Sequence, residues 1–379
     1  MPDYQIPFNK PAYIGTEKQY VSDVLQSGHQ SGDGNYTKKC SAILEQALGV
    51  EKVLLTTSCT HALEMAAILL DIKPGDEVII PSFTFVSTVN AFVLRGAKPV
   101  FVDIRPDTLN LDEEQLERHI TPKTRAVVPV HYAGVGCDMD RIGEISQKYN
   151  IKVVEDNAHG LFGKYKERWL GTFGVLATQS FHETKNFSCG EGGALVINDP
   201  ALNERAEIIR EKGTNRSRFF RGQVDKYTWV DIGSSYLPSE TLAAILYAQL
   251  EARDKIQQRR GEIWRQYYDR LGEWTAANEV RLPYTPSDCE QPFHLFYLLL
   301  PNLGTRTRFI QALRDKGIYS VFHYLPLHLS DMGRKFGGKE GDCPFTESIS
   351  DRLVRLPLFY NLPARDQEFI LETIIKLRL

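Results

Sequence analysis

The stretch Gln179–Asn198, QSFHETKNFSCGEGGALVIN, places one lysine, Lys185, between two apolar runs that have the composition of β-strands. Small residues dominate the turn after the lysine, with Gly190, Gly192 and Gly193 in close succession. If both runs lie in one sheet, the amine lies near the floor of a pocket, where burial lowers its pKa and makes it a nucleophile. A lone lysine in a turn is more often a solvated side chain. The interpretation therefore depends on the residues that accompany Lys185 elsewhere in the chain.

The composition is that of an ordinary globular protein. The chain has 379 residues, of which 42% are hydrophobic and 25% charged, and its net charge is −3. Because this length exceeds one simple core, we expect a large domain over residues 1–250 and a small one over residues 251–379. The slightly acidic charge argues against a nucleic-acid partner. No apolar run is long enough to predict a membrane span.

The six cysteines are scattered and form no C-x-x-C pair. This spacing indicates neither a zinc site nor a disulfide framework, so we expect no metal and a reducing, cytoplasmic location. The first residues, MPDYQIPF, also lack the basic and apolar regions of a signal peptide.

Strand-like and helical patterns alternate along the first part of the chain, which predicts a mainly parallel sheet with helices on both faces. The predicted strands cover residues 53–56, 77–81, 99–103, 124–132, 151–156, 177–181 and 194–197. The predicted helices cover residues 16–27, 61–67, 83–93, 111–119, 140–149 and 202–211. A long helix over 239–271 is expected to lead into the small domain, with strands near 293–300 and 321–324 and helices near 307–316 and 365–376.

Polar residues follow several predicted strands at the end where parallel sheets bind ligands. The segment Thr57–Thr60 lies between a strand and a helix, where free N–H groups, the helix dipole and hydroxyls suit an anion. Ordinary capping of the helix is the commoner role for such residues. Phe85, Asp156 and Ser180 lie at equivalent strand ends. This shared position is the main evidence for one site.

Asp156 ends an apolar run and is followed after two residues by His159. The carboxylate can cap the next segment, or it can pair with a protonated pyridine nitrogen and raise the pKa of that nitrogen. A ring kept cationic in this way is the electron sink of pyridoxal phosphate (PLP) enzymes, which also need a reactive lysine such as Lys185. His159 can contact an oxygen of such a ring, or it can be a satisfied, partly buried histidine.

The loop at residues 212–226 is basic and aromatic, with five cations and one acid. It is interpreted either as a solvated surface or as a diphosphate site, because arginine presents a fork of donors. Stacking of its phenylalanines on RNA bases is a weaker alternative in an acidic protein. Farther on, FHYLPLH at residues 322–328 is interpreted as a packing or site-lining loop, with His328 as a candidate substrate contact.

Five motifs occur in the order found in one known family: TSCTHAL (57–63), PSFTFVST (81–88), VVEDNAHG (153–160), SFHETKN (180–186) and GEGG (190–193). On these motifs the chain resembles the DegT-type sugar-nucleotide aminotransferases over nearly its whole length. The resemblance implies an α/β, aspartate-aminotransferase-like fold (PLP fold type I), with a mostly parallel sheet in the large domain and a smaller C-terminal α+β domain. It also implies a homodimer with the active site at the interface.

The resemblance implies a role for each matching residue. Lys185 takes the place of the Schiff-base lysine that also moves the proton, and Asp156 takes the place of the partner of the pyridinium nitrogen. Phe85 matches an aromatic that stacks on the ring, and His159 matches a Gln or His near the ring oxygen. The positions that bind the cofactor phosphate correspond to Cys59, Thr60 and Ser180.

One motif departs from the family. Many relatives have GYNYRM, in which the Asn reaches the phosphate of the neighbouring subunit's cofactor. Here the stretch at residues 233–238 is GSSYLP, so Ser235 stands in the Asn position. Serine is shorter, so the predicted cofactor contact of Ser235 across the subunits is lost or mediated by water.

Four further stretches, VHYAG (130–134), REKGTNRS (210–217), FRGQVDKYTW (220–229) and DIGSSYL (231–237), resemble one branch of the family. That branch aminates dTDP-4-keto-6-deoxy-D-glucose with L-glutamate, with pyridoxamine phosphate as the intermediate form of the cofactor. Its product, dTDP-4-amino-4,6-dideoxy-D-galactose, serves the enterobacterial common antigen. The candidate contacts for the dTDP diphosphate are Arg216, Arg218, Arg221 and Lys226.

Several alternatives remain open at this stage. A related enzyme that aminates the sugar at C3, or that yields the gluco epimer, has the same motifs, and no arginine is assigned to the glutamate carboxylate. A sugar dehydrase of the family is disfavoured because such relatives replace the lysine, and Lys185 is intact. A non-catalytic sensor or binding protein on the same fold is a more remote alternative.

Overall fold

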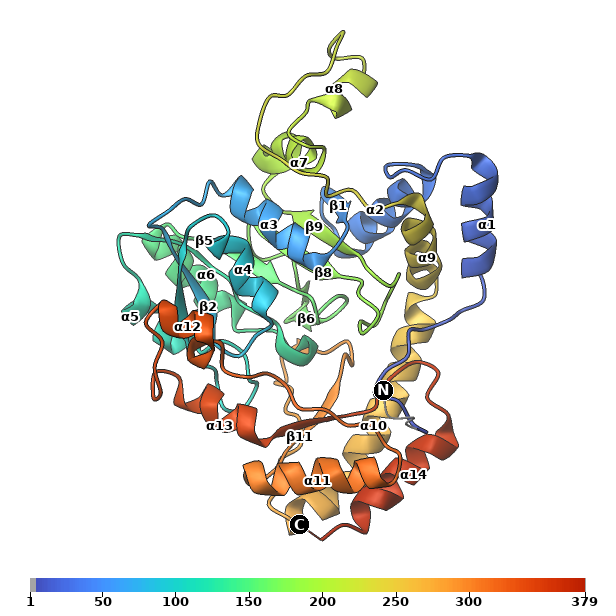
Figure 1. Ribbon diagram of the computed structural model, residues 1–379, viewed down its shortest axis with the longest axis vertical. Helices are drawn as coiled ribbons and strands as arrows, with labels where there is room; N and C mark the ends of the chain where they lie inside the picture. The colour runs from blue at the N-terminus through green and yellow to red at the C-terminus, as the bar shows by residue number, and fades with distance from the viewer. Residues whose placement is uncertain (1–4, 379) are drawn as a thin grey trace.

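A seven-stranded sheet forms the centre of the larger part of the molecule in the computed structural model, which describes residues 5–378 (Figure 1). The strands lie in the order β1 (Lys52–Thr56), β9 (Gly193–Ile197), β8 (Leu176–Ser180), β5 (Lys152–Asp156), β4 (Thr124–Val127), β2 (Glu77–Pro81) and β3 (Lys98–Val102). Only β9 runs antiparallel to its neighbours, and the other adjacent pairs are parallel. The predicted α/β fold with a mostly parallel sheet is confirmed.

Helices cover both faces of this sheet because side chains alternate along each buried strand. In β2, Val78 and Ile80 enter the core on one face, whereas Ile79 enters the core on the other. The first face is covered by α3 (Cys59–Leu69), α4 (Val86–Val93) and α7 (Asn203–Arg210). The second face is covered by α1 (Glu17–Ser27), α2 (Asn35–Leu48), α5 (Leu116–His119), α6 (Met139–Tyr149) and α9 (Glu240–Glu251).

A two-stranded antiparallel sheet, β11 (Phe296–Leu299) with β12 (Leu353–Leu356), organises the smaller part. One face of it packs on α10 (Arg253–Ala277), α11 (Leu303–Asp315) and α14 (Ala364–Ile375). The other face, with Tyr297, Leu299 and Leu353, packs against Phe83 and Tyr132 of the larger part. Figure 1 shows α10 running from α9 to this smaller part. The division of the chain after residue 250 stays a prediction.

The remaining elements are short. They are β6 (Lys164–Tyr165), β7 (Arg168–Trp169), α8 (Arg216–Phe220), β10 (Cys289–Glu290), α12 (Asp331–Lys335) and α13 (Pro344–Arg352). Figure 1 shows α8 and the adjoining loop projecting beyond the body of the molecule. Within residues 5–378, no helix combines the length and apolarity that a membrane crossing requires, and the cytoplasmic location stays a prediction.

Some predicted elements differ from the structure. The helix expected over 239–271 is two helices, α9 and α10, that meet at Ala252. In α10, Ile256 is buried in the core of the larger part, whereas Ile263 is buried in the core of the smaller part. The strand expected over 124–132 ends at Val127, shortly before Pro129, which lacks an N–H. Residues 321–324 form no strand beyond the single bridge between Val321 and β12. The helix expected over 83–93 begins at Val86, and that over 111–119 is a 3-10 turn followed by α5.

Gly193 is the point where β9 passes closest to the turn after β1. It pairs with Thr56 on one side and Ser180 on the other. A Cβ on Gly193 would lie 2.3 Å from the carbonyl carbon of Ser58 and 2.4 Å from the nitrogen of Cys59. Because residue 193 has no side chain, the turn at the start of α3 can pack directly against β9.

We predict that Gly193→Ala destabilises the protein by about 1–3 kcal/mol, because backbone must move to admit the methyl group. Urea unfolding followed by circular dichroism measures the change. Gly143→Ala is the control, since a Cβ at this position in α6 meets no atom within 4 Å. Equal unfolding midpoints for both variants would contradict the packing argument.

Candidate active site

Lys185 lies in a closed turn between β8 and β9. The turn is held by hydrogen bonds from Phe181 N to Gly192 O at 2.8 Å and from Glu183 N to Gly190 O at 2.9 Å. The residue as a whole is half-buried, and burial of its amine lowers the pKa of Lys185 to about 8. The nearby Cys59 and Asp156 raise this pKa, and Arg355 lowers it. The amine is therefore a neutral nucleophile at a lower pH than an ordinary lysine.

Asp156 ends β5 with its carboxylate buried. Thr88 Oγ1 donates to Oδ2 at 2.7 Å, and the backbone N–H of Ala158 donates to Oδ1 at 3.2 Å. Within residues 5–378, no cationic side chain lies within 4 Å of this carboxylate. Burial raises the pKa of Asp156, and the two hydrogen bonds and the charges of Lys185 and His131 oppose this effect only in part. A cation placed here would find an acceptor that is already desolvated.

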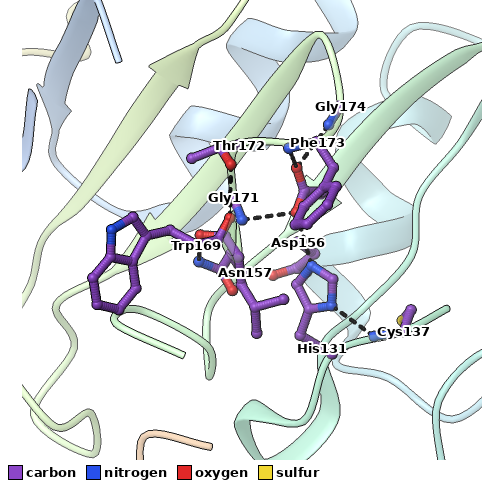
Figure 2. Close-up of polar contacts among 12 residues, drawn as sticks. His131, Cys137, Asp156, Asn157, Trp169, Gly171, Thr172, Phe173 and Gly174 are labelled. Carbon is purple, nitrogen blue, oxygen red and sulfur yellow. Dashed lines mark hydrogen bonds and ion pairs between the residues drawn. The ribbon is translucent and has the colours of Figure 1, made fainter. Parts of the chain in front are cut away.

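The residue before it, Glu155, anchors the end of β5 from the opposite face. Its buried carboxylate accepts hydrogen bonds from Gly171 N at 2.7 Å, Phe173 N at 2.6 Å and Gly174 N at 2.7 Å. His131 Nε2 lies 2.9 Å from Glu155 Oε2, and His131 Nδ1 accepts from the backbone N–H of Cys137 at 3.1 Å. Figure 2 shows His131 and the Gly171–Gly174 turn gathered around this strand end. These bonds fix the direction in which Asp156 projects.

Three histidines form a wall beside the lysine. His159 stacks on His294 with ring centroids 4.2 Å apart, and His323 lies 6.1 Å from His159. Burial lowers the pKa of all three well below the ordinary value, so they are neutral at pH 7. His159 Nδ1 is buried and has no hydrogen-bond partner among the described residues. An unpaired buried nitrogen of this kind indicates a place for a ligand group.

The start of α3 supplies an anion-binding turn. Ser58 caps the helix by accepting from His61 N at 3.1 Å, and the following residues Cys59 and Thr60 open the helix. Thr60 Oγ1 donates to Ser87 Oγ at 2.8 Å, which joins the start of α3 to α4. Ser180, the last residue of β8, reaches the same edge of the sheet through β9. Burial raises the pKa of Cys59, so its thiol stays protonated.

The structure thus brings together most of the residues predicted for the cofactor. Phe85 lies in the turn between β2 and α4, directly before α4, and is 56% exposed, which leaves its ring free to cover a ligand. Ser235 does not join the other predicted cofactor residues within one chain. It lines a separate cavity of about 1000 Å³ together with Arg210, Glu211 and Arg216.

The candidate diphosphate contacts also lie apart from Lys185 in the single chain, on and near α8. Arg216, Arg218 and Arg221 approach acidic residues of α7 and its end, at 3.8 Å from Glu211, 3.1 Å from Glu204 and 2.8 Å from Glu207. Lys226 is exposed, and no ion pair joins it to another residue of the described chain.

His328 is fully buried, and both of its ring nitrogens have partners. Nδ1 lies 2.6 Å from Ser82 Oγ, and Nε2 lies 2.9 Å from Glu347 Oε1. This geometry favours a structural role that ties α13 to the end of β2. It gives no support to the predicted contact with a substrate.

The chain is similar to known proteins over nearly its whole length. Residues 12–375 match the model of the DegT/DnrJ/EryC1/StrS aminotransferase family. This chain belongs to that family.

Proteins that are similar to this chain in sequence and in structure support its assignment to the DegT/DnrJ/EryC1/StrS family. The spore coat polysaccharide biosynthesis protein SpsC of Bacillus subtilis is 33% identical over 380 residues, covering 97% of this chain and 96% of SpsC. The aminotransferase TlmJ of Streptoalloteichus hindustanus superposes with a TM-score of 0.89 at 30% identity, covering 98% of both chains. Spr1654 of Streptococcus pneumoniae, whose structure is known in a PLP form, gives 0.89 at 29% identity, again covering 98% of both chains.

The residues of this member of the family fit PLP on the evidence of the structure itself. Among the described residues, the buried carboxylate of Asp156 has no cationic partner, as a pyridinium nitrogen requires, and His159 has a buried nitrogen without a hydrogen-bond partner. Lys185 has the lowered pKa that Schiff-base chemistry requires. The start of α3 offers N–H groups to a phosphate.

Several side chains that line this site were not predicted from the sequence. Thr88 holds Asp156, and His294, His323 and Arg355 reach the lysine from the smaller part of the molecule. The sequence contains one indication for Arg355. In LVRLPL (353–358) this charged residue interrupts an apolar run, at a position on the same strand face as Leu353.

We predict that labelling of Lys185 in the cofactor-free protein is half-maximal near pH 8, because only the neutral amine reacts and its pKa is lowered to about 8. An ordinary lysine titrates near pH 10.4. Reductive methylation at a series of pH values, quantified by peptide mass spectrometry, measures the profile. Asp156→Asn removes a charge that raises this pKa, so the profile moves to lower pH. A profile unmoved by that variant would show that the two groups are not coupled.

Proposed function

We propose that this protein is a PLP-dependent aminotransferase of sugar nucleotides. In the proposed reaction, dTDP-4-keto-6-deoxy-D-glucose and L-glutamate give dTDP-4-amino-4,6-dideoxy-D-galactose and 2-oxoglutarate, as in dTDP-4-amino-4,6-dideoxygalactose transaminase. The observation that carries the chemistry is a lysine of lowered pKa near a buried carboxylate that has no cationic partner within residues 5–378. The sugar substrate is supported by the family and by the motifs at residues 130–134 and 210–237.

Each part of the site has a role in this proposal. Asp156 would hold the ring nitrogen in its cationic form, and His159 would donate to or accept from the ring oxygen. Phe85 would cover one face of the ring. The phosphate would be held by the backbone of Cys59 and the hydroxyls of Thr60 and Ser180, at the positive end of the α3 dipole.

Proton transfer is assigned to Lys185. PLP, when bound, carries the amino group between the two half-reactions and withdraws electrons from the carbon that loses a proton. The Nζ atom of Lys185 takes the proton from Cα of the donor amino acid, and in the second half-reaction it delivers a proton to C4 of the sugar. With a pKa of about 8, the amine is available as a base near neutral pH and, once protonated, is an acid of matched strength.

The proposed active unit is a homodimer. Exposed apolar residues gather on the lobe formed by α8 and the loop after it, where Phe220 is 69% and Trp229 is 76% exposed. Tyr227, Val230 and Ile232 of this lobe are also exposed. Such a concentration of apolar surface is typical of an interface. A second chain that covers the lobe would bring Ser235 and the basic residues of α8 toward a neighbouring active site.

We predict that the protein sediments as a dimer and that Trp229→Arg shifts it toward the monomer, because a charge replaces a large apolar contact. Sedimentation velocity measures the mass, and the PLP absorbance band measures whether the site survives. Phe369→Arg in α14 is a control for an exposed aromatic outside the lobe. A monomer that turns over at full rate would refute the proposed interface.

We predict that the purified protein, incubated with PLP, L-glutamate and dTDP-4-keto-6-deoxy-D-glucose, forms 2-oxoglutarate and an amino sugar nucleotide. Lys185→Ala abolishes both turnover and the visible absorbance of the lysine-bound cofactor, whereas Lys152→Ala at the exposed start of β5 retains them. Proton couplings of the product identify the ring position and epimer. An amine found at C3, or an equatorial amine at C4, would show that the proposed product is wrong. A protein that binds no PLP would instead support a sensor or binding role.

A further inference from the structure

Two buried threonines form a chain of hydrogen bonds that ends on the carboxylate of Asp156. Thr84 lies in the turn before α4 and is buried, and Thr88, one helical turn later, is fully buried. Their hydroxyl oxygens lie 2.9 Å apart, and Thr88 Oγ1 lies 2.7 Å from Asp156 Oδ2. The segment between β2 and α4 therefore reaches Asp156 through two hydroxyl groups in series.

The proton of each hydroxyl in this chain has a single destination. A threonine hydroxyl carries one proton and can also accept a proton from another donor. Because Thr88 donates its proton to the ionised Asp156, Thr84 must supply the proton of the contact between the two hydroxyls. Each hydroxyl polarises the next one, and the members of such a chain strengthen one another. The chain is thus directed from Thr84 through Thr88 to Asp156.

The carboxylate of Asp156 has few other groups to stabilise its charge. Its Oδ1 atom accepts from the backbone N–H of Ala158 at 3.2 Å, and among residues 5–378 no third donor reaches the carboxylate. Burial raises the pKa of Asp156, whereas the hydrogen bonds from Thr88 and Ala158 lower it. A hydrogen bond to an ionised acceptor is stronger than one to a neutral acceptor. Loss of the Thr88 hydroxyl therefore favours the protonated acid, which cannot pair with a pyridinium nitrogen.

The titratable groups that face Asp156 from other elements do not replace this hydrogen bond. The charges of Lys185, in the turn after β8, and of His131, in the loop after β4, also lower the pKa of Asp156. No ion pair shorter than 4 Å joins either of them to Asp156. Cys59 and Tyr324 face Asp156 as well, and burial raises the pKa of both, so they stay neutral. Of the hydrogen bonds to the carboxylate, the one from Thr88 is the shortest.

The segment that carries Thr84 is fixed by the smaller part of the molecule. Ser82 O accepts from the backbone N–H of Leu327 at 3.1 Å, and Ser82 Oγ lies 2.6 Å from His328 Nδ1. On the other side of Thr84, α4 begins at Val86. These contacts limit the positions that the Thr84 hydroxyl can take, so the protein sets the direction of the first hydroxyl in the chain.

We propose that Thr84 and Thr88 are positioning residues that hold the Asp156 carboxylate in its ionised form and in a fixed orientation. The ionisation of Asp156 is a property of the protein alone, whereas its consequence for a bound ring rests on the proposed aminotransferase function. In that function one proton lies between the ring nitrogen and the carboxylate. Hydrogen bonds that stabilise the carboxylate keep this proton on the nitrogen. Both threonines thus act on the ring through Asp156.

The first test uses the full-length, cofactor-free protein labelled with carbon-13 at the aspartate carboxyl groups. The NMR signal of Asp156 is the one that Asp156→Asn removes, and its pH titration gives a midpoint. Thr88→Val is expected to raise this midpoint by about one pH unit, the difference between hydrogen bonds to a charged and to a neutral acceptor. Thr88→Ser keeps the hydroxyl and is expected to keep the midpoint. Thr275→Val is the matched control, because this buried threonine of α10 donates to Gly272 O at 2.9 Å.

A double variant tests whether the two threonines act in series. Thr84→Val alone is expected to raise the midpoint by less than about half of the Thr88→Val shift, because Thr88 still donates. In the Thr88→Val background, Thr84→Val is expected to add nothing, since Thr84 acts through Thr88. The double variant leaves neither of the two hydroxyls unpaired, so it supplies the measurement if Thr88→Val alone does not fold.

The second test uses the protein loaded with PLP that carries nitrogen-15 in its ring. The chemical shift of this nitrogen distinguishes the protonated ring from the neutral ring. At a fixed pH, Thr88→Val is expected to lower the protonated fraction, and Thr88→Ser is expected to retain it. This measurement does not depend on turnover or on the identity of the sugar substrate.

Four results would overturn the proposal. An unchanged midpoint in Thr88→Val would show that the hydroxyl does not stabilise the anion. Equal shifts in Thr88→Ser or Thr275→Val would assign the effect to packing, and additive shifts in the double variant would show that Thr84 acts independently. A raised midpoint with an unchanged ring nitrogen would refute the role toward the cofactor. The expected titration shifts in a protein that binds no PLP would support the hydroxyl chain and refute the proposed aminotransferase.

Discussion

The desolvation of two opposite charges at one edge of the central sheet is the constraint on which the rest of the structure depends. Asp156 ends β5 and Lys185 lies in the turn that follows the adjacent strand β8, and burial shifts the pKa of each in the direction that favours its neutral form. Lys185 and Asp156 form no ion pair shorter than 4 Å, so neither charge is neutralised by direct contact with the other. In a fold that placed these two groups in direct contact, the amine and the carboxylate would form an ion pair, and neither would be available to a cofactor. The separation of the two groups is therefore as important as their burial.

Rigid backbone maintains that separation. Glu155 fixes the end of β5 through three backbone N–H groups and His131, while the closed turn from Phe181 to Gly192 fixes the lysine. Gly193 allows β9 to pass within contact distance of the turn that precedes α3. A buried network whose members are all hydrogen-bonded is rigid. His159 Nδ1 in the histidine wall is buried without a hydrogen-bond partner among residues 5–378, and it lies where a ligand is expected.

The sequence predicts what depends on local pattern and fails where distant segments meet. Strand ends such as Asp156 and Ser180 are predictable, because apolar runs, turns and helices follow one another in a regular order and the carboxyl ends of parallel strands share an edge. Arg355, His294 and His323 are not predictable in this way, since their position near Lys185 depends on how the two-stranded sheet packs on the larger part. His328 shows the reverse case: its motif suggests a site, yet Ser82 and Glu347 occupy both nitrogens. Tertiary packing decides whether a polar side chain hydrogen-bonds within the protein or stays available to a ligand.

The distribution of charge gives the two parts of the molecule different tasks. The larger part supplies the lysine, the carboxylate and the helix N-terminus, which together suit a cationic ring with a phosphate. The smaller part supplies Arg355 in surroundings that are otherwise neutral, so it adds one positive charge close to the lysine. That charge lowers the pKa of Lys185. Two effects from different parts of the molecule therefore favour the neutral, nucleophilic form of Lys185: burial in the turn between β8 and β9, and the charge of Arg355.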